Sequence, residues 1–87
     1  SKTQPMETVS SIFNFTNLNP RVDLSKVSRI VPARDNPHNT KIAMLYFYRS
    51  YKNECEPILR IWFYNSTSMR DKELEIISKK YPHLTSV

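Results

Sequence analysis

Two apolar, aromatic-rich segments in the second half of the chain constrain the fold more than any other feature. Residues 41–50 (KIAMLYFYRS) and 57–64 (PILRIWFY) are separated only by the polar stretch 51–56. Ile, Tyr, Phe and Trp favour strands, and a short polar connection between two such segments is typical of a hairpin. Each segment is apolar at both odd and even positions, which a strand tolerates only when both of its faces are covered. The sequence therefore predicts a hairpin that the rest of the chain must cover.

The length of the chain allows one domain with one modest core, since it has 87 residues. Residues 1–8 are polar and predict a flexible tail, so we expect a single domain over residues 9–87. Within it, residues 9–15 (VSSIFNF) predict a first strand because their apolar side chains partly alternate.

The next segment predicts a short helix. Asn19 is a good N-cap, and Pro20 suits the first helical position. Apolar residues then recur at spacings of three and four, as on one face of a helix: Leu24, Val27, Ile30 and Val31. Pro32 cannot continue a helix, so we expect the helix to end before it.

A second helix is expected near the end of the chain. Ser68 begins the sequence SMRD, which resembles a capping box, and Pro82 should end the helix at Tyr81. An alternative interpretation makes residues 72–76 a short fourth strand, but the apolar spacing favours a helix. The expected fold class is α+β: a small mixed sheet in strand–helix–strand–strand–helix order, with helices covering the sheet. A strand–helix–strand unit makes its two strands parallel, and the hairpin adds an antiparallel neighbour.

The layout resembles the thioredoxin-like protein family of the mitochondrial large ribosomal subunit. The matching stretches are residues 13–15 (FNF), 26–30 (KVSRI), 41–42 (KI) and 57–64 (PILRIWFY), and the resemblance extends over roughly residues 9–77. It implies a thioredoxin-like fold and a non-catalytic structural subunit in the mitochondrial matrix. It also implies that the partners are ribosomal RNA and neighbouring ribosomal proteins in a hetero-complex.

The charge balance favours a polyanionic partner. The chain has 13 Lys and Arg against 8 Asp and Glu, which makes its net charge +5. Cations beside aromatic rings on strands are typical of sheets that stack bases and hold phosphates. We therefore expect RNA contacts at five basic residues: Arg34, Lys41, Arg49, Lys52 and Arg60. In the alternative interpretation, the strand arginines pair with nearby glutamates and the loop residues are simply solvated.

Alternation along the second strand of the hairpin divides its side chains between two faces. We expect Leu59, Ile61 and Phe63 to face the core, which leaves Ile58, Arg60, Trp62 and Tyr64 on a more open face. Expected partner contacts are Tyr48, Trp62 and Tyr64 on the strands, and His38 in the irregular loop of residues 32–40. The alternative is that the rings are core. A second hypothesis for function is a protein–protein adaptor that uses the Trp62 face.

The sequence predicts neither a catalytic nor a metal site. The single cysteine, Cys55, cannot form an intramolecular disulfide, and the charges of Glu54 and Glu56 disfavour its thiolate. His38 and His83 lack neighbours at metal-ligand spacing. We expect a non-enzymatic protein with no cofactor and no small-molecule substrate, since no nucleophile–base pair is visible. We expect no membrane contact, because no apolar run approaches the ~18 residues of a spanning helix.

Overall fold

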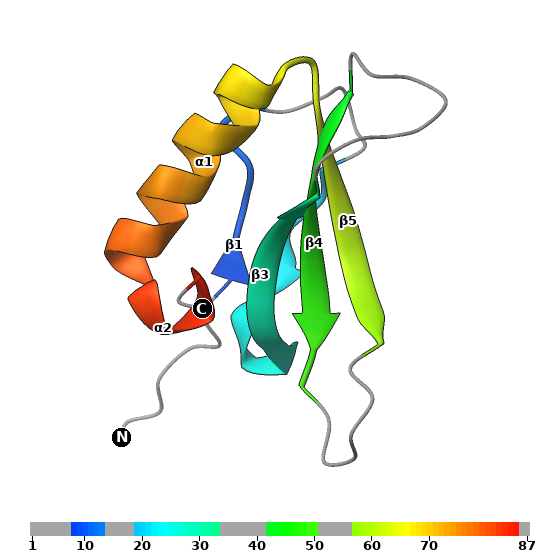
Figure 1. The fold of residues 1–87 in the computed structure, drawn as a ribbon. Helices are drawn as coiled ribbons and strands as arrows, with labels where there is room; N and C mark the ends of the chain where they lie inside the picture. The colour runs from blue at the N-terminus through cyan, green and yellow to red at the C-terminus, as the bar shows by residue number, and fades with distance from the viewer. Residues whose placement is uncertain (1–7, 14–18, 34–41, 51–56, 86–87) are drawn as a thin grey trace.

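The computed structural model describes residues 8–13, 19–33, 42–50 and 57–85. Its elements, in chain order, are β1 (Thr8–Val9), β2 (Val22–Asp23), the short 3-10 helix η1 (Leu24–Lys26), β3 (Val27–Ala33), β4 (Ala43–Arg49), β5 (Ile58–Tyr64), α1 (Thr67–Lys80) and α2 (Pro82–Thr85). Figure 1 shows the strands β3, β4 and β5 side by side, with α1 packed along them. The chain is a small α+β domain, which confirms the expected class at that level.

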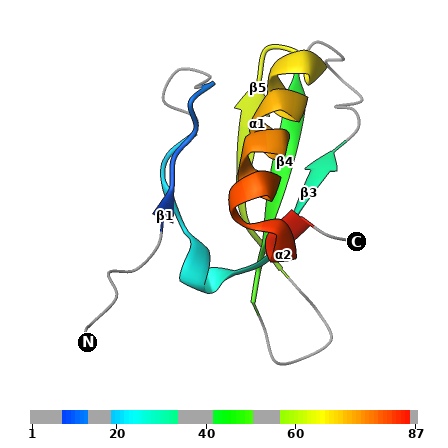
Figure 2. The ribbon, with the colours of Figure 1, turned by 90° about the vertical axis from the view of Figure 1, so that its left-hand side faces the viewer.

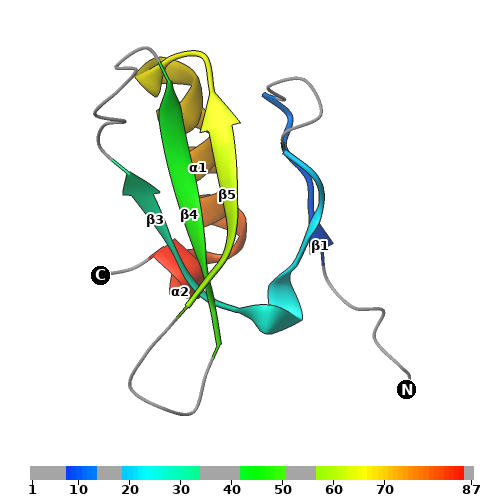
Figure 3. The ribbon, with the colours of Figure 1, turned by 90° about the vertical axis from the view of Figure 1, so that its right-hand side faces the viewer.

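The described strands form two antiparallel sheets. β3, β4 and β5 make a three-stranded sheet in that order, and β1 pairs with β2 in a separate two-stranded sheet. The smaller sheet lies beyond the β5 side of the larger one (Figures 2 and 3). Every strand pair in the described residues is antiparallel. The expected parallel pair is therefore wrong, and the thioredoxin-like order is not confirmed.

The expected first helix is also wrong, since its second half is the strand β3. Its β-branched residues favour extended structure, and Pro32 is tolerated because β3 is at the edge of the sheet. The pairing of β3 with β4 shifts between Val27 and Arg29. This irregularity adds one residue to β3, so Val27 and Ile30 both face the core although they are three residues apart. A spacing of three, which is typical of a helix, here comes from an irregular strand.

The hairpin of β4 and β5 is confirmed. Its register runs from Ala43 opposite Tyr64 to Phe47 opposite Arg60, and the pairing then shifts so that Tyr48 lies opposite Ile58. Residues 51–56, the expected connection, lie outside the described residues. The extra residue on β5 changes which side chains share a face at this end of the strand.

The helix α1 is confirmed, and its N-cap lies two residues before the expected cap, Ser68. Ser66, in extended backbone, is the N-cap, and its hydroxyl accepts a hydrogen bond from the backbone N–H of Met69 at 3.2 Å. α1 ends at Lys80 with Tyr81 as its C-cap, and Pro82 begins α2. Because α1 includes residues 72–76, the alternative fourth strand is wrong.

The beginning of the domain is less regular than the sequence suggests. β1 contains Thr8 and Val9, which pair with Asp23 and Val22, so Thr8 belongs to a strand rather than to the expected tail. Residues 10–13 are not in a strand, and residues 14–18 lie outside the described part, as do residues 1–7. The expected strand over residues 9–15 is therefore confirmed only at Val9.

The core lies between α1 and the larger sheet. Its largest fully buried side chains are Leu45, Phe47, Trp62 and Tyr64, and Ile77 and Leu84 from the helices pack in the same cluster. The rings of Phe47 and Trp62 are 4.5 Å apart between centroids. The expected division of β5 is therefore inverted at Ile61, Trp62, Phe63 and Tyr64, because the face with Trp62 and Tyr64 is the one that α1 covers. It holds at the start of the strand, where Leu59 packs against the core and Ile58 is exposed. Burying two large rings removes more apolar area from water than burying smaller side chains does.

Candidate functional site

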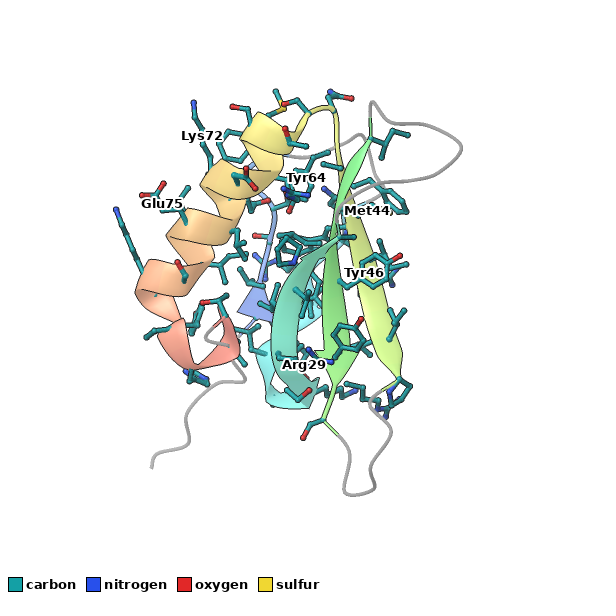
Figure 4. The ribbon with its side chains drawn as sticks, in the orientation of Figure 1. Arg29, Met44, Tyr46, Tyr64, Lys72 and Glu75 are labelled. Carbon is teal, nitrogen blue, oxygen red and sulfur yellow. The ribbon has the colours of Figure 1, made fainter. Side chains whose placement is uncertain are left out.

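The larger sheet has a second face, on the side away from α1. Residues directly opposite each other on paired strands share a face. The register therefore places on this face, which we call the open sheet face, Arg29, Val31, Ala33, Met44, Tyr46, Tyr48, Ile58, Ile61 and Phe63. None of the described helices or strands lies over it (Figure 3). Figure 4 shows Met44 and Tyr46 on this side of the sheet, whereas Tyr64 lies between the sheet and α1.

The centre of the open sheet face combines two tyrosines with a cation. The rings of Tyr46 and Tyr48 are 6.2 Å apart between centroids and tilted by 43°. The guanidinium carbon of Arg29 lies 4.4 Å from the centroid of the Tyr48 ring, which is a cation–π contact. Both tyrosines are half-buried and Arg29 is exposed. Rings presented in this way can stack on planar groups, and the exposed guanidinium can bind an anion.

The open sheet face is also apolar at its rim and along β5. Ile58 is 48% exposed, and Ile61, Phe63 and Val31 are half-buried. Met44 on the same face is buried, so Ile58 is the strongly exposed apolar side chain here. An exposed apolar side chain beside partly exposed ones is more typical of an interaction surface than of a catalytic site.

The expected RNA-binding residues are only partly placed by the structure. Arg34, Lys41 and Lys52 lie outside the described residues, as does the expected contact residue His38. Arg49 and Arg60 are exposed, at the end of β4 and within β5. Arg60 lies opposite Phe47, so it belongs to the face that α1 covers and not to the open sheet face.

Two of the three expected strand contacts are corrected. Trp62 and Tyr64 are each 0% exposed, so their rings are core side chains and cannot present a surface to a partner. Tyr48 lies on the open sheet face, as a partner contact requires. The sequence does not single out Arg29 as a contact residue, since it predicts a helix over this segment. The signal that could have found it is the run of β-branched residues around it.

Asn19, which the sequence predicts to be a helix N-cap, instead forms hydrogen bonds with the backbone at the edge of β5. The side-chain Nδ2 of Asn19 donates to the backbone oxygen of Phe63, and its Oδ1 accepts from the Phe63 N–H, both at 2.7 Å. Trp62 Nε1 donates to the backbone oxygen of Pro20 at 2.9 Å. The Asn19 amide therefore takes the place of a neighbouring strand at this position, and Asn19 is structural.

A buried carboxylate joins three parts of the chain. Glu73 of α1 is 2% exposed, and its Oε1 accepts from the Tyr64 hydroxyl at 2.8 Å and from the hydroxyl of Ser11. Its Oε2 accepts from the backbone N–H of Ile12 at 3.0 Å. Burial, and then the adjacent charge of Glu73, raise the pKa of Tyr64 far above its usual range. Among the described residues no buried side-chain polar atom lacks a partner, so we interpret this cluster as structural.

Neither a metal site nor a membrane-spanning helix is found in the described residues. Within residues 8–13, 19–33, 42–50 and 57–85, no group of three or more His, Cys, Asp or Glu is placed to hold a metal ion. No helix in these ranges has the length and apolar character needed to cross a bilayer.

Comparison with known proteins gives no match. No family model, no curated protein and no solved structure is significantly similar to this chain. The resemblance to mitochondrial large-subunit ribosomal proteins therefore stays a prediction. The geometry of the open sheet face and the charge of the chain are the features from which a function can be inferred.

Proposed function

We propose that the protein is a non-catalytic structural subunit of a ribonucleoprotein and that it binds RNA through the open sheet face. The observation that carries this proposal is the arrangement of Arg29 over Tyr48, beside Tyr46, on a sheet face without cover in the described structure. The net charge of +5 supports a polyanionic partner.

Single-stranded or looped RNA is the form that this face would bind. Bases that are not paired can stack on tyrosine rings, whereas the bases of a duplex are not accessible in this way. Tyr46 and Tyr48 would supply the stacking surface, and Arg29 would bind a base edge or a phosphate. The predicted phosphate contacts at Arg34, Lys41, Arg49 and Lys52 would add sequence-independent affinity.

The particle that we propose is the mitochondrial large ribosomal subunit, in the mitochondrial matrix, with ribosomal RNA and neighbouring ribosomal proteins as partners. Support for this particle comes from the sequence resemblance, and one of its stretches, residues 57–64, ends with the strand β5. The thioredoxin-like arrangement is not part of the proposal, because residues 27–33 form a strand.

The stacking role can be tested with a single-stranded RNA oligonucleotide and the double variant Tyr46→Leu/Tyr48→Leu. Leucine keeps the face apolar but removes the rings, so we expect at least about a tenfold loss of affinity, since one stacked base is worth about 1–3 kcal/mol. The matched control is Ile76→Leu on α1, an exposed residue away from the open sheet face. Circular dichroism checks that each variant is folded. Unchanged affinity of the folded double variant would contradict the proposal.

A protein–protein adaptor is the second candidate, and the exposed apolar side chain of Ile58 favours it. This function would use the open sheet face, because Trp62 is buried. The variant Ile58→Glu would then abolish assembly with a protein partner, whereas Tyr46→Leu/Tyr48→Leu would leave assembly intact because leucine preserves the apolar area. RNA binding predicts the opposite ranking of these two variants.

A further inference from the structure

A separate cavity lies where the segment around η1 meets β5, at a place distinct from the open sheet face. Its volume is about 180 Å³, and its lining residues are Arg21, Val22, Asp23, Lys26, Leu59 and Arg60. These residues come from just before β2, from β2 and η1, and from β5. The β2–η1 segment and β5 are therefore brought together at this cavity by their side chains. The cavity is therefore a product of the tertiary structure.

The charges around this cavity are predominantly positive. Three of its lining residues are cations (Arg21, Lys26 and Arg60) and one is a carboxylate, Asp23. Asp23 offsets only part of this positive charge: its Oδ1 accepts from the backbone N–H of Ser25 at 3.0 Å and from the Ser25 hydroxyl at 2.8 Å, and its carboxylate also interacts with the nearby charge of Lys26. These two hydrogen bonds lower the pKa of Asp23. Among the described residues, no ion pair joins Asp23 to any of the three cations.

Arg70 has bound partners among the described residues, in contrast to Arg21 and Arg60. The Nη1 of Arg70 donates to the backbone oxygen of Ala33 at 2.5 Å, and its Nη2 forms an ion pair with Asp71 at 2.8 Å. Arg21 and Arg60 are exposed and have no such bond or ion pair with any described residue. Like charges gathered at one concave site repel each other, and an anionic ligand would relieve this repulsion.

We propose that this cavity binds a phosphate group. Two guanidinium groups can each donate two parallel hydrogen bonds to phosphate oxygens, and the ammonium of Lys26 adds a point charge. Val22 and Leu59 provide an apolar wall beside the charged groups, against which the sugar attached to a phosphate can pack. The phosphate can belong to an RNA backbone or to a small phosphorylated compound, and the site chemistry is the same for both.

The test uses the whole chain and two probes, a single-stranded RNA oligonucleotide and inorganic pyrophosphate. NMR signals of the arginine side chains report contact, and we expect the Nε–Hε signals of Arg21 and Arg60 to shift with at least one probe. Shifts with RNA but not with pyrophosphate assign the cavity to a backbone phosphate, and saturable shifts with pyrophosphate assign it to a small phosphorylated compound. If neither probe shifts these two signals, the proposal is wrong.

Two double variants, each of which removes two positive charges, distinguish a specific phosphate site from a general effect of net charge. Arg21→Gln/Arg60→Gln removes two charges from the cavity, and Lys72→Gln/Lys79→Gln removes two exposed charges from α1. We expect the cavity pair to weaken binding of the effective probe at least about tenfold, with a slope of log affinity against log salt that is smaller by about 0.7 per lost RNA phosphate contact. We expect less than about a twofold change for the control pair, because exposed charges away from a ligand are screened by salt. Equal losses of affinity for the probe in the two double variants would overturn the proposal.

This inference and the proposed function can fail independently. If the pyrophosphate shifts occur but Tyr46→Leu/Tyr48→Leu leaves RNA affinity unchanged, the phosphate site stands and the open sheet face is not the RNA-binding surface. If the tyrosine variant loses RNA affinity while the arginine signals stay unchanged with both probes, the open sheet face stands and the phosphate site does not.

Discussion

The hydroxyl of Tyr64 donates a hydrogen bond to the buried carboxylate of Glu73 at 2.8 Å, and this bond joins β5 to α1. Both residues are removed from solvent, with exposed fractions of 0% and 2%. A hydrogen bond to a buried charge stabilises a fold more than one between neutral groups does. This pair, which the sequence places nine residues apart, therefore positions the helix on the sheet, on the side away from the open sheet face.

Removal of the Tyr64 hydroxyl should destabilise the protein. In Tyr64→Phe the Glu73 carboxylate loses a donor inside the core, so we expect the free energy of unfolding to fall by about 1.5–3 kcal/mol. Urea unfolding measures the change. The control is Tyr46→Phe on the open sheet face, for which we expect a change within about 0.5 kcal/mol. Equal effects of the two substitutions would contradict a structural role for the buried pair.

The Tyr64 hydroxyl should also make the free energy of unfolding fall as the pH rises in the alkaline range. The pKa of Tyr64 is raised in the folded protein above its ordinary value of 10.0. Below that value both states hold the proton, and the stabilisation is fully present. Above it the unfolded chain loses the proton while the folded protein keeps it, so the free energy of unfolding falls by up to about 1.4 kcal/mol per pH unit. Urea unfolding between about pH 9 and 11 should therefore show a steeper decline for the native chain than for Tyr64→Phe. Parallel declines would show that Tyr64 titrates alike in both states.

The two side-chain hydrogen bonds from Asn19 to the backbone of Phe63 in β5 should contribute about 1–3 kcal/mol to the free energy of unfolding. We expect Asn19→Ala to lower the free energy of unfolding by that amount and to speed hydrogen exchange of the Phe63 amide. The matched control is Asn65→Ala, because Asn65 is exposed just after β5. Unchanged exchange at Phe63 would mean that Asn19 does not protect this edge.

Trp62 should be protected from water both with and without RNA. It is the only tryptophan in the sequence, so the fluorescence of the protein above the tyrosine range reports on it alone. Because it is 0% exposed and packed against Phe47, we expect a blue-shifted emission with little quenching by iodide. Strong quenching in the folded protein, relieved by RNA, would instead support the sequence-based expectation that Trp62 contacts the partner.

The start of α1 can be tested at two serines. Ser66 caps the helix, so Ser66→Ala should lower the free energy of unfolding by about 1 kcal/mol. Ser68, the cap expected from the sequence, is exposed inside the first turn, so Ser68→Ala should change stability by less than about 0.5 kcal/mol. Thermal unfolding of the two variants compares them directly, and the reverse ranking would place the helix start at Ser68.

The elements that sequence reasoning predicted well are those with strong local signals. β4 and β5 are rich in aromatic and β-branched residues, and the apolar residues of α1 recur at helical spacing up to Pro82. The sequence predicts a helix where β3 forms, because the irregularity of β3 places Val27 and Ile30 on one side with a helical spacing. A local pattern cannot distinguish these two cases, since the extra residue is recognised only from the partner strand.

The candidate surface was predicted less well, because two kinds of long-range information were needed. Alternation correctly groups Arg60, Trp62 and Tyr64 on one face, yet it does not tell which face the helix covers. Arg29 contacts Tyr48 only because β3 pairs with β4, and Arg21 and Arg60 line one cavity only because the segment around η1 lies beside β5.

Local chemistry along the chain determined the hairpin, the main helix and the basic character of the protein, because strand preference, helical spacing and charge are properties of neighbouring residues. The tertiary structure decided which sheet face is buried and which cations lie together. The physical reason is that burial of Trp62 and Tyr64 depends on α1 packing against them, and no residue adjacent to these two rings in the sequence carries that information.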